Sequence, residues 1–138
     1  MSVGILVVDD EPDVAELFRQ SFRLEVRQGT YVMHFAKSGN EALELLSDEI
    51  QPTLLAVLSD INMPGMDGLT LLGEIKQRFP ELPVMIVTAY GDDERRRLAS
   101  ENGATELLTK PIDFDHLKAQ LRRLPSAAPI KNARLSIK

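Results

Sequence analysis

The sequence contains no cysteine, too few basic residues to balance its acids, and no long apolar run. The absence of cysteine excludes disulfide bonds and thiolate metal sites. The formal net charge of −5 argues against a general surface for nucleic acid or membrane. No apolar run approaches the roughly 20 residues that span a bilayer, and the N-terminal residues do not form a signal-peptide pattern. These absences predict a cytoplasmic protein with no direct nucleic-acid or membrane partner.

The length and the alternation of apolar runs with helix-like segments predict the fold class. A chain of 138 residues can form one domain with a buried core. Repeated strand-then-helix units favour parallel strands joined by right-handed crossovers. We therefore expect a doubly wound, flavodoxin-like α/β sheet of five parallel strands in the order 2-1-3-4-5, with five flanking helices. The expected strands are residues 5–8, 31–36, 54–59, 84–87 and 106–109.

Two of the expected helices have informative boundaries or faces. The first starts near Pro12, a good first-turn residue, and its apolar spacing continues until Gly29 offers a stop. The fourth opens with the acids of residues 92–94, which favour a helix N-terminus. Its apolar stripe is thin and consists mainly of Leu98 and Ala99. A helix with few buried apolar contacts costs little to shift.

The alternating pattern fails from Pro125 onward. Residues 125–129 read Pro-Ser-Ala-Ala-Pro, a composition typical of a linker. We expect one folded domain at residues 1–124 and a linker or C-terminal tail at residues 125–138.

Polar side chains follow four of the expected strands. Asp9 and Asp10 come after the first strand, Asp60 after the third, Thr88 after the fourth, and Lys110 after the fifth. Because the carboxyl ends of neighbouring parallel strands meet at one edge of an open sheet, we expect these residues to converge where such folds bind ligands. Three carboxylates gathered there indicate a cation or a chemical role.

The donor types at this edge predict a magnesium site. Oxygen ligands without histidine or cysteine suit Mg²⁺, which keeps several waters and takes one or two carboxylates from a protein. We expect Asp10 and Asp60 to be direct ligands and Asp9 to act mainly through a water. Asn62 would contribute its backbone carbonyl.

The same residues predict transfer of a phosphoryl group, in which positioning and charge neutralisation dominate. A carboxylate can accept that group as an acyl phosphate, and Asp60 is the best acceptor because it closes the central strand. Lys110 would place a positive charge near the reacting carboxylate. Thr88 would donate a hydroxyl hydrogen bond.

Each segment also has an ordinary structural interpretation. Residues 9–12 could be a helix N-cap, and residues 60–65 could simply start a turn. Thr88 could be a strand residue and Lys110 a solvated surface charge. Taken together, these four separate structural interpretations are less convincing, because all four segments end on the same predicted edge.

Other charged and titratable residues are assigned structural roles. Arg95, Arg96 and Arg97 are interpreted as a solvated helix face, with a partner-docking patch as the alternative. His34 and His116 have no partner at metal or catalytic spacing, so each is expected to be structural or exposed.

Four motifs together resemble the receiver domain of two-component response regulators, of the chemotaxis-regulator type. The matching segments are LVVDDEP at residues 6–12, DINMPGMDG at 60–68, VTAYG at 87–91 and LTKP at 108–111. The resemblance covers about residues 3 to 124, which is nearly the whole expected domain.

The resemblance implies a phosphorylation switch. A sensor histidine kinase or a phosphotransfer protein would supply phosphohistidine, and Asp60 would accept its phosphoryl group with Mg²⁺ bound. The domain would be no conventional enzyme, although it would catalyse its own phosphotransfer and dephosphorylation. The resemblance also implies a cis bond between Lys110 and Pro111, and it places Asn62 and Tyr90 where the family tunes dephosphorylation.

The output expected from the resemblance is a change of partner. The responsive face would comprise the fourth helix, the fifth strand and the fifth helix, and a phosphorylation-dependent dimer through this face is one form of it. The effector is not identified; the segment from Leu24 to Tyr31, together with Ile112-Asp113-Phe114 after Lys110-Pro111, resembles receivers attached to signalling enzymes.

Two departures from the family pattern stand out. Leu107 occupies the place, three residues before the lysine, where the family often has an aromatic switch side chain. The segment from Leu24 to Tyr31 is longer than the usual short turn, and it could extend the first helix past the sheet.

Two other functions use the same residues. A magnesium phosphatase of the haloacid-dehalogenase type would use Asp60 as nucleophile, but it usually has an acid two residues later, where this chain has Asn62. A phosphorylation-independent interaction domain would not need the acid pair or Lys110.

Overall fold

One parallel sheet organises the molecule. The computed structural model describes residues 3–47, 54–89 and 91–125. Its five strands lie in the order β2-β1-β3-β4-β5, all parallel, which confirms the predicted topology. The bounds are β1 (Val3–Val8), β2 (Tyr31–Ala36), β3 (Leu54–Asp60), β4 (Val84–Thr88) and β5 (Glu106–Thr109).

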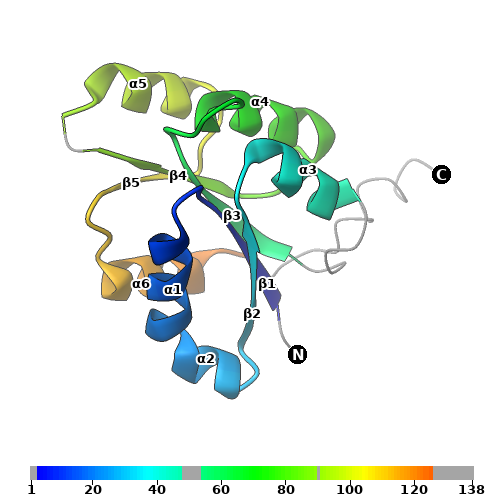
Figure 1. Cartoon of the computed structure of the whole chain (residues 1–138), viewed down its shortest axis with the longest axis vertical. Helices are drawn as coiled ribbons and strands as arrows, with labels where there is room; N and C mark the ends of the chain where they lie inside the picture. The colour runs from blue at the N-terminus through cyan, green and yellow to red at the C-terminus, as the bar shows by residue number, and fades with distance from the viewer. Residues whose placement is uncertain (1–2, 48–53, 90, 126–138) are drawn as a thin grey trace.

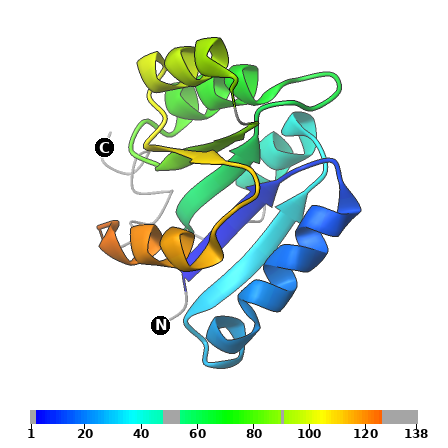
Figure 2. The ribbon, with the colours of Figure 1, turned by 90° about the vertical axis from the view of Figure 1, so that its left-hand side faces the viewer.

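Helices cover both faces of this sheet (Figure 1). One apolar cluster lies under α3, α4 and α5, and a second lies under α1 and α6. Figure 2 shows the sheet between these two layers. Every residue of β3 is buried, as expected for a central strand with helices on both sides. The helices are α1 (Pro12–Ser21), α2 (Arg23–Arg27), α3 (Gly39–Ser47), α4 (Gly68–Arg78), α5 (Asp93–Glu101) and α6 (Phe114–Arg123).

The described ranges contain six helices rather than the five expected, because the predicted first helix is broken at Phe22. The backbone of Phe22, with φ −104° and ψ 13°, leaves the α-helical region. Its ring is fully buried, packing 6.0 Å from Phe18 and 5.9 Å from Tyr31 between ring centroids. The helix then restarts as α2 in the long segment before β2. Apolar spacing continues through residues 22–26, so periodicity alone does not reveal this break.

Contacts with α6 hold α2 in place. Lys118 Nζ lies 3.0 Å from Glu25 Oε2 and donates a 2.6 Å hydrogen bond to the carbonyl oxygen of Ser21. The Lys118 ammonium also lies 5.1 Å from the centroid of the Phe22 ring. The extra helix is therefore anchored by partly buried charge as well as by aromatic packing.

The fourth predicted helix, α5, is attached to the sheet by little apolar surface. Of its residues, all of which the structure describes, Ala99 is buried. Leu98 is half-buried. This agrees with the thin apolar stripe predicted from the sequence.

No helix in the described ranges is long and apolar enough to cross a bilayer. Of the predicted linker or tail at residues 125–138, residues 126–138 lie outside the described residues, as does Tyr90.

Candidate functional site

The carboxyl ends of four strands bring the predicted site residues together. Val8 pairs with Ser59, Asp60 with Val87, and Thr88 with Thr109, so these strands end side by side. Asp9 and Asp10 directly follow β1, and Lys110 directly follows β5. The convergence expected from strand order is therefore present in the tertiary structure.

Three carboxylates form an acidic cluster at this edge. One oxygen from each of Asp9, Asp10 and Asp60 lies within 4.8 Å of the other two. The side chains of Asp9 and Asp60 are each only 7% exposed, whereas Asp10 is exposed to solvent. Hard oxygen donors with no nitrogen or sulfur among them fit Mg²⁺ and leave solvent-facing room for its waters.

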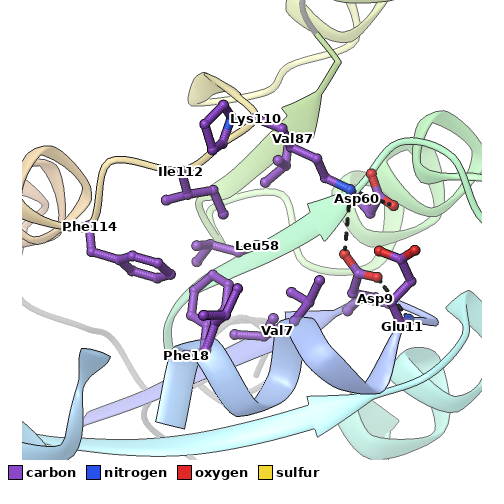
Figure 3. A pocket seen from close by; sticks show the side chains of 14 residues that line it. Val7, Asp9, Glu11, Phe18, Leu58, Asp60, Val87, Lys110, Ile112 and Phe114 are labelled. Carbon is purple, nitrogen blue, oxygen red and sulfur yellow. Dashed lines mark hydrogen bonds and ion pairs between the residues drawn. The ribbon is translucent and has the colours of Figure 1, made fainter. Parts of the chain in front are cut away.

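Lys110 is the cation that reaches this cluster. Its Nζ lies 3.4 Å from Asp60 Oδ2 and 4.0 Å from Asp9 Oδ2. Figure 3 shows its ammonium pointing at the two carboxylates from the β5–α6 loop. The backbone N–H of Lys110 donates to the carbonyl oxygen of Thr88 over 2.9 Å. The Lys110-Pro111 peptide is cis, which confirms that expectation.

The surroundings of Asp9 perturb its protonation. Burial raises the pKa of Asp9 above its ordinary value of 3.8, and the neighbouring charge of Asp60 raises it further. The Glu11 N–H, which donates to Asp9 Oδ1 over 2.9 Å, and the charge of Lys110 act in the opposite direction. Without a metal ion, this site therefore holds negative charge that burial disfavours.

Replacing that charge will stabilise the metal-free protein. In wild type, raising the pH from 3.8 through the raised pKa of Asp9 lowers the free energy of unfolding, because the folded state binds more protons than the unfolded state. Asp9→Asn removes this loss. We expect it to raise the free energy of unfolding at pH 7 relative to wild type, measured by urea denaturation with chelator present.

Two conditions check the cause of that gain. Well below pH 3.8, where the Asp9 carboxyl is protonated in both states, the difference between variant and wild type should disappear. Adding Mg²⁺ should stabilise wild type more than Asp9→Asn, because a ligand that binds the folded state stabilises it by mass action. A variant less stable than wild type at pH 7 without metal would contradict the prediction.

Thr88 is buried and its hydroxyl is engaged on the side of α5. Thr88 Oγ1 donates a long, 3.4 Å hydrogen bond to the carbonyl oxygen of Leu108. The same oxygen accepts a 3.0 Å hydrogen bond from Arg96 Nη1. That Nη1 also lies 2.9 Å from Thr109 Oγ1, to which it donates. One guanidinium therefore joins hydroxyls from the ends of β4 and β5.

The interpretation of the three arginines as a solvated face is wrong for Arg96, whereas the contact of Arg95 lies in exposed surroundings. Arg95 Nη1 donates to Asn62 Oδ1 in the loop after β3, and Arg96 reaches the Thr88 hydroxyl. Arg97 does lie at the surface, paired with glutamates of its own helix. The available signal was spacing: Arg95 and Arg96 precede buried Ala99 by four and three residues, and so share its face.

The loop after β3 folds tightly back onto the backbone of Asp60. Gly68 donates its N–H to the carbonyl oxygen of Ile61 over 2.9 Å. A Cβ at Gly68 would lie 2.4 Å from the backbone oxygen of Asp60. Asp67 caps α4 by accepting a 2.8 Å hydrogen bond from Thr70 N–H. This turn positions Asp60 and the amino end of α4 together.

An apolar cavity opens beside the acidic cluster, a feature that sequence analysis missed. Its volume is about 550 Å³, and it lies between α1 and the segment that leads from Lys110 into α6. Figure 3 shows Phe18, Ile112 and Phe114 on its floor and walls, with Asp9 and Asp60 at its rim. The side chains come from elements far apart in the chain, so no local motif marks the cavity.

Leu107 lies on the opposite face of β5 from this cavity. It pairs with Ile86 in the sheet and packs, half-buried, against the apolar cluster under α3, α4 and α5. Its side chain has no polar group with which to follow a change at Thr88.

Fold and site together define a class of protein. It is a doubly wound α/β domain that has, at the carboxyl edge of its sheet, an acidic cluster suited to bind a cation, a hydroxyl and a lysine. The family model described as "Response regulator receiver domain" matches residues 5–122, and the chain belongs to that family.

Individual relatives agree with this assignment. The chain is 47% identical over 124 residues to "DNA-binding transcriptional regulator NtrC" of Salmonella typhimurium, covering 89% of this chain and 25% of that protein. The receiver domain of NtrX from Brucella abortus superposes with a TM-score of 0.74 at 34% identity, covering 86% of this chain and 95% of that one. The signal receiver domain of an HD domain-containing protein from Pseudomonas fluorescens Pf-5 gives a TM-score of 0.78 at 29% identity, covering 90% and 94%. The chain spans about a quarter of the length of NtrC and of ZraR.

Proposed function

We propose that this receiver domain accepts a phosphoryl group on Asp60 from the phosphohistidine of a sensor histidine kinase or phosphotransfer protein. The observation that carries the proposal is the position of Asp60. Its largely buried carboxylate ends the central strand, lies 3.4 Å from Lys110 Nζ and belongs to the acidic cluster. A carboxylate so placed is a nucleophile with a cation at hand to balance the incoming charge.

The transfer step is a displacement at phosphorus. An Asp60 carboxylate oxygen bonds to phosphorus while the bond from phosphorus to the imidazole nitrogen breaks. The electron pair of that bond stays on the nitrogen, and Asp60 becomes a mixed carboxylic–phosphoric anhydride. Lys110 Nζ lies close enough to offset negative charge on the transferred group. Positioning and charge neutralisation are the main contributions that a protein makes to such a step.

The metal site in this proposal is Mg²⁺ held by Asp9, Asp10 and Asp60, with the backbone carbonyl of Asn62 as a further ligand. Mg²⁺ bound there would neutralise repulsion between the carboxylates and the phosphoryl oxygens. The fit rests on two features: all three ligands are carboxylate oxygens, and one oxygen from each lies within 4.8 Å of the other two. Magnesium removal by chelator should therefore stop phosphoryl uptake.

Thr88 and a water complete the cycle. After transfer, the Thr88 hydroxyl turns toward the new phosphoryl group and donates to one of its oxygens. Attack of water on phosphorus then breaks the bond to the Asp60 oxygen, releasing inorganic phosphate and restoring the carboxylate. Asn62 and Tyr90 would set the rate of this hydrolysis.

The output in this proposal is a change of partner at the face made by α5, β5 and α6, including a phosphorylation-dependent dimer. Residues 1–124 would form the receiver unit and residues 125–138 a linker or tail toward an effector, in a cytoplasmic protein. The named relatives carry different outputs, since one is a DNA-binding regulator and another an HD domain-containing protein. The attached effector, such as a fused signalling enzyme, is therefore a separate question from the receiver chemistry.

The test is the intact mass of the chain after incubation with acetyl phosphate and Mg²⁺. We expect a gain equal to one phosphoryl group, which decays with time and does not form when chelator replaces Mg²⁺. Beryllofluoride, which mimics a bound phosphoryl group, should perturb amide signals of the site residues under the same conditions. A chain that gains no mass and shows no such perturbation would refute the proposed function.

A further inference from the structure

Arg96 connects α5 to the candidate site through side-chain hydrogen bonds. Its Nη1 donates to Thr88 Oγ1 over 3.0 Å and to Thr109 Oγ1 over 2.9 Å, both in partly buried surroundings. Thr88 ends β4 beside Asp60, and Thr109 immediately precedes Lys110. A movement of either hydroxyl therefore changes a hydrogen bond made by a side chain of α5.

These polar contacts matter because α5 has little else to hold it. Ala99 is its buried residue within Asp93–Glu101, all of which the structure describes, and Leu98 is half-buried. Arg95, next to Arg96, donates to Asn62 Oδ1 on the other side of the site. Two consecutive arginines thus tie one helix to the strand end that carries Thr88 and to the loop that follows Asp60.

The Thr88 hydroxyl can donate its proton to only one acceptor at a time. A threonine hydroxyl has one proton and two lone pairs. Here Arg96 donates to the oxygen, and the proton is directed to the Leu108 carbonyl oxygen, away from Asp60. Donating that proton to a phosphoryl oxygen on Asp60 requires the hydroxyl to turn inward, which breaks the Leu108 contact and separates Oγ1 from Arg96.

We propose that Arg96 is the positioning residue that couples Asp60 to α5: it holds Thr88 in the outward position in the unmodified protein and is released when Thr88 turns inward. This inference rests on the proposed phosphoacceptor function. Arg96 takes the reporting role for which Leu107, with an apolar side chain packed against the core, has no suitable group. Loss of the Thr88 contact leaves Arg96 with the Thr109 contact, so α5 is held less tightly and can shift toward a different partner-binding position.

The coupling predicts the sign of a binding change. Arg96→Met removes a restraint that favours the outward Thr88, so beryllofluoride with Mg²⁺ should bind about tenfold more tightly than to wild type, the size expected for one charge-assisted hydrogen bond. If Arg96 acted only as a positive charge near an anion, the same substitution would weaken binding. Calorimetric titration of beryllofluoride into the full chain separates the two.

A matched control lies on the same helix. Arg97→Met removes the same charge from the next position, where the guanidinium pairs with Glu94 and Glu101 at the surface. We expect its beryllofluoride affinity to stay within about twofold of wild type. Amide signals of residues 93–101 should move on beryllofluoride binding in wild type and in Arg97→Met. In Arg96→Met they should be shifted before the ligand is added and move less afterwards.

A double substitution tests whether the effect passes through Thr88. In a Thr88→Ala background the contact is already absent, so adding Arg96→Met should not change beryllofluoride affinity. Unchanged or weaker binding by Arg96→Met alone, or the same gain in both backgrounds, would overturn the inference. Wild type that fails to bind beryllofluoride with Mg²⁺ would overturn the proposed function as well, so the two failures are distinct.

Discussion

Asp60→Asn will abolish phosphoryl uptake, with a loss on the order of a thousandfold or more in the rate of transfer, as for removal of other catalytic nucleophiles. The amide differs from the carboxylate by one atom and fills nearly the same space at the end of β3. It lacks the negative charge that makes Asp60 a nucleophile and that pairs with Lys110 Nζ at 3.4 Å. After acetyl phosphate and Mg²⁺, the intact mass of the variant should remain that of the unmodified chain.

The loss in Asp60→Asn should not reflect unfolding. The substitution removes one of three clustered negative charges, so the metal-free variant should be at least as stable as wild type in urea. Asp115→Asn is the matched control, because Asp115 is an exposed carboxylate in the first turn of α6. This control should gain the phosphoryl mass normally. If Asp60→Asn still gains that mass, the acceptor is another carboxylate, with Asp9 and Asp10 the nearest candidates.

Gly68→Ala will lower the free energy of unfolding by about 3 kcal/mol and reduce phosphoryl uptake together with it. A Cβ at this position would lie 2.4 Å from the backbone oxygen of Asp60 and 2.7 Å from the Cα of Ile61. Neither atom can move away as a flexible side chain would, because both belong to the backbone that carries Asp60. Relief of the clash must shift either the phosphoacceptor or the first turn of α4.

Gly73→Ala provides the opposite outcome on the same helix. Gly73 lies in the interior of α4, is exposed, and has nothing within 4 Å of the position its Cβ would take. Alanine is a better helix former than glycine by about 1 kcal/mol, so this variant should be more stable than wild type by about that amount. Urea denaturation monitored by circular dichroism measures both. Equal effects of the two substitutions would show that the tight approach of Gly68 to Asp60 is unimportant.

Much of the architecture could be predicted from the chain because it rests on local signals that repeat. The continuous apolar run before Asp60 indicates a strand buried on both faces, and β3 is indeed buried throughout. Parallel connections then place the ends of β1, β3, β4 and β5 at one edge. Once that edge is known, the proximity of Asp9 to Asp60 follows from topology alone.

The break at Phe22 could not be predicted in this way. Phe18 and Phe22 have the spacing of one helix face, and both rings are buried. What turns the chain is packing between distant elements, including Tyr31 in β2 and Lys118 in α6. Leu17 and Val26 are apolar and lie within the span of the single helix expected up to Gly29, yet they are exposed by 52% and 44%.

The amino-acid sequence by itself determined the order of elements, the alternation that makes the sheet parallel, and the identities of Asp9, Asp60, Thr88 and Lys110 as residues at strand ends. These depend on local hydrophobic periodicity and on which residues directly follow each apolar run. Only the tertiary structure decided which groups those residues meet. Long side chains such as Arg96 can point to solvent or inward from the same helix position, and the choice depends on whether a neighbouring strand offers partners. Here the hydroxyls of Thr88 and Thr109 offer them, and a cluster interpreted as surface charge becomes part of the site.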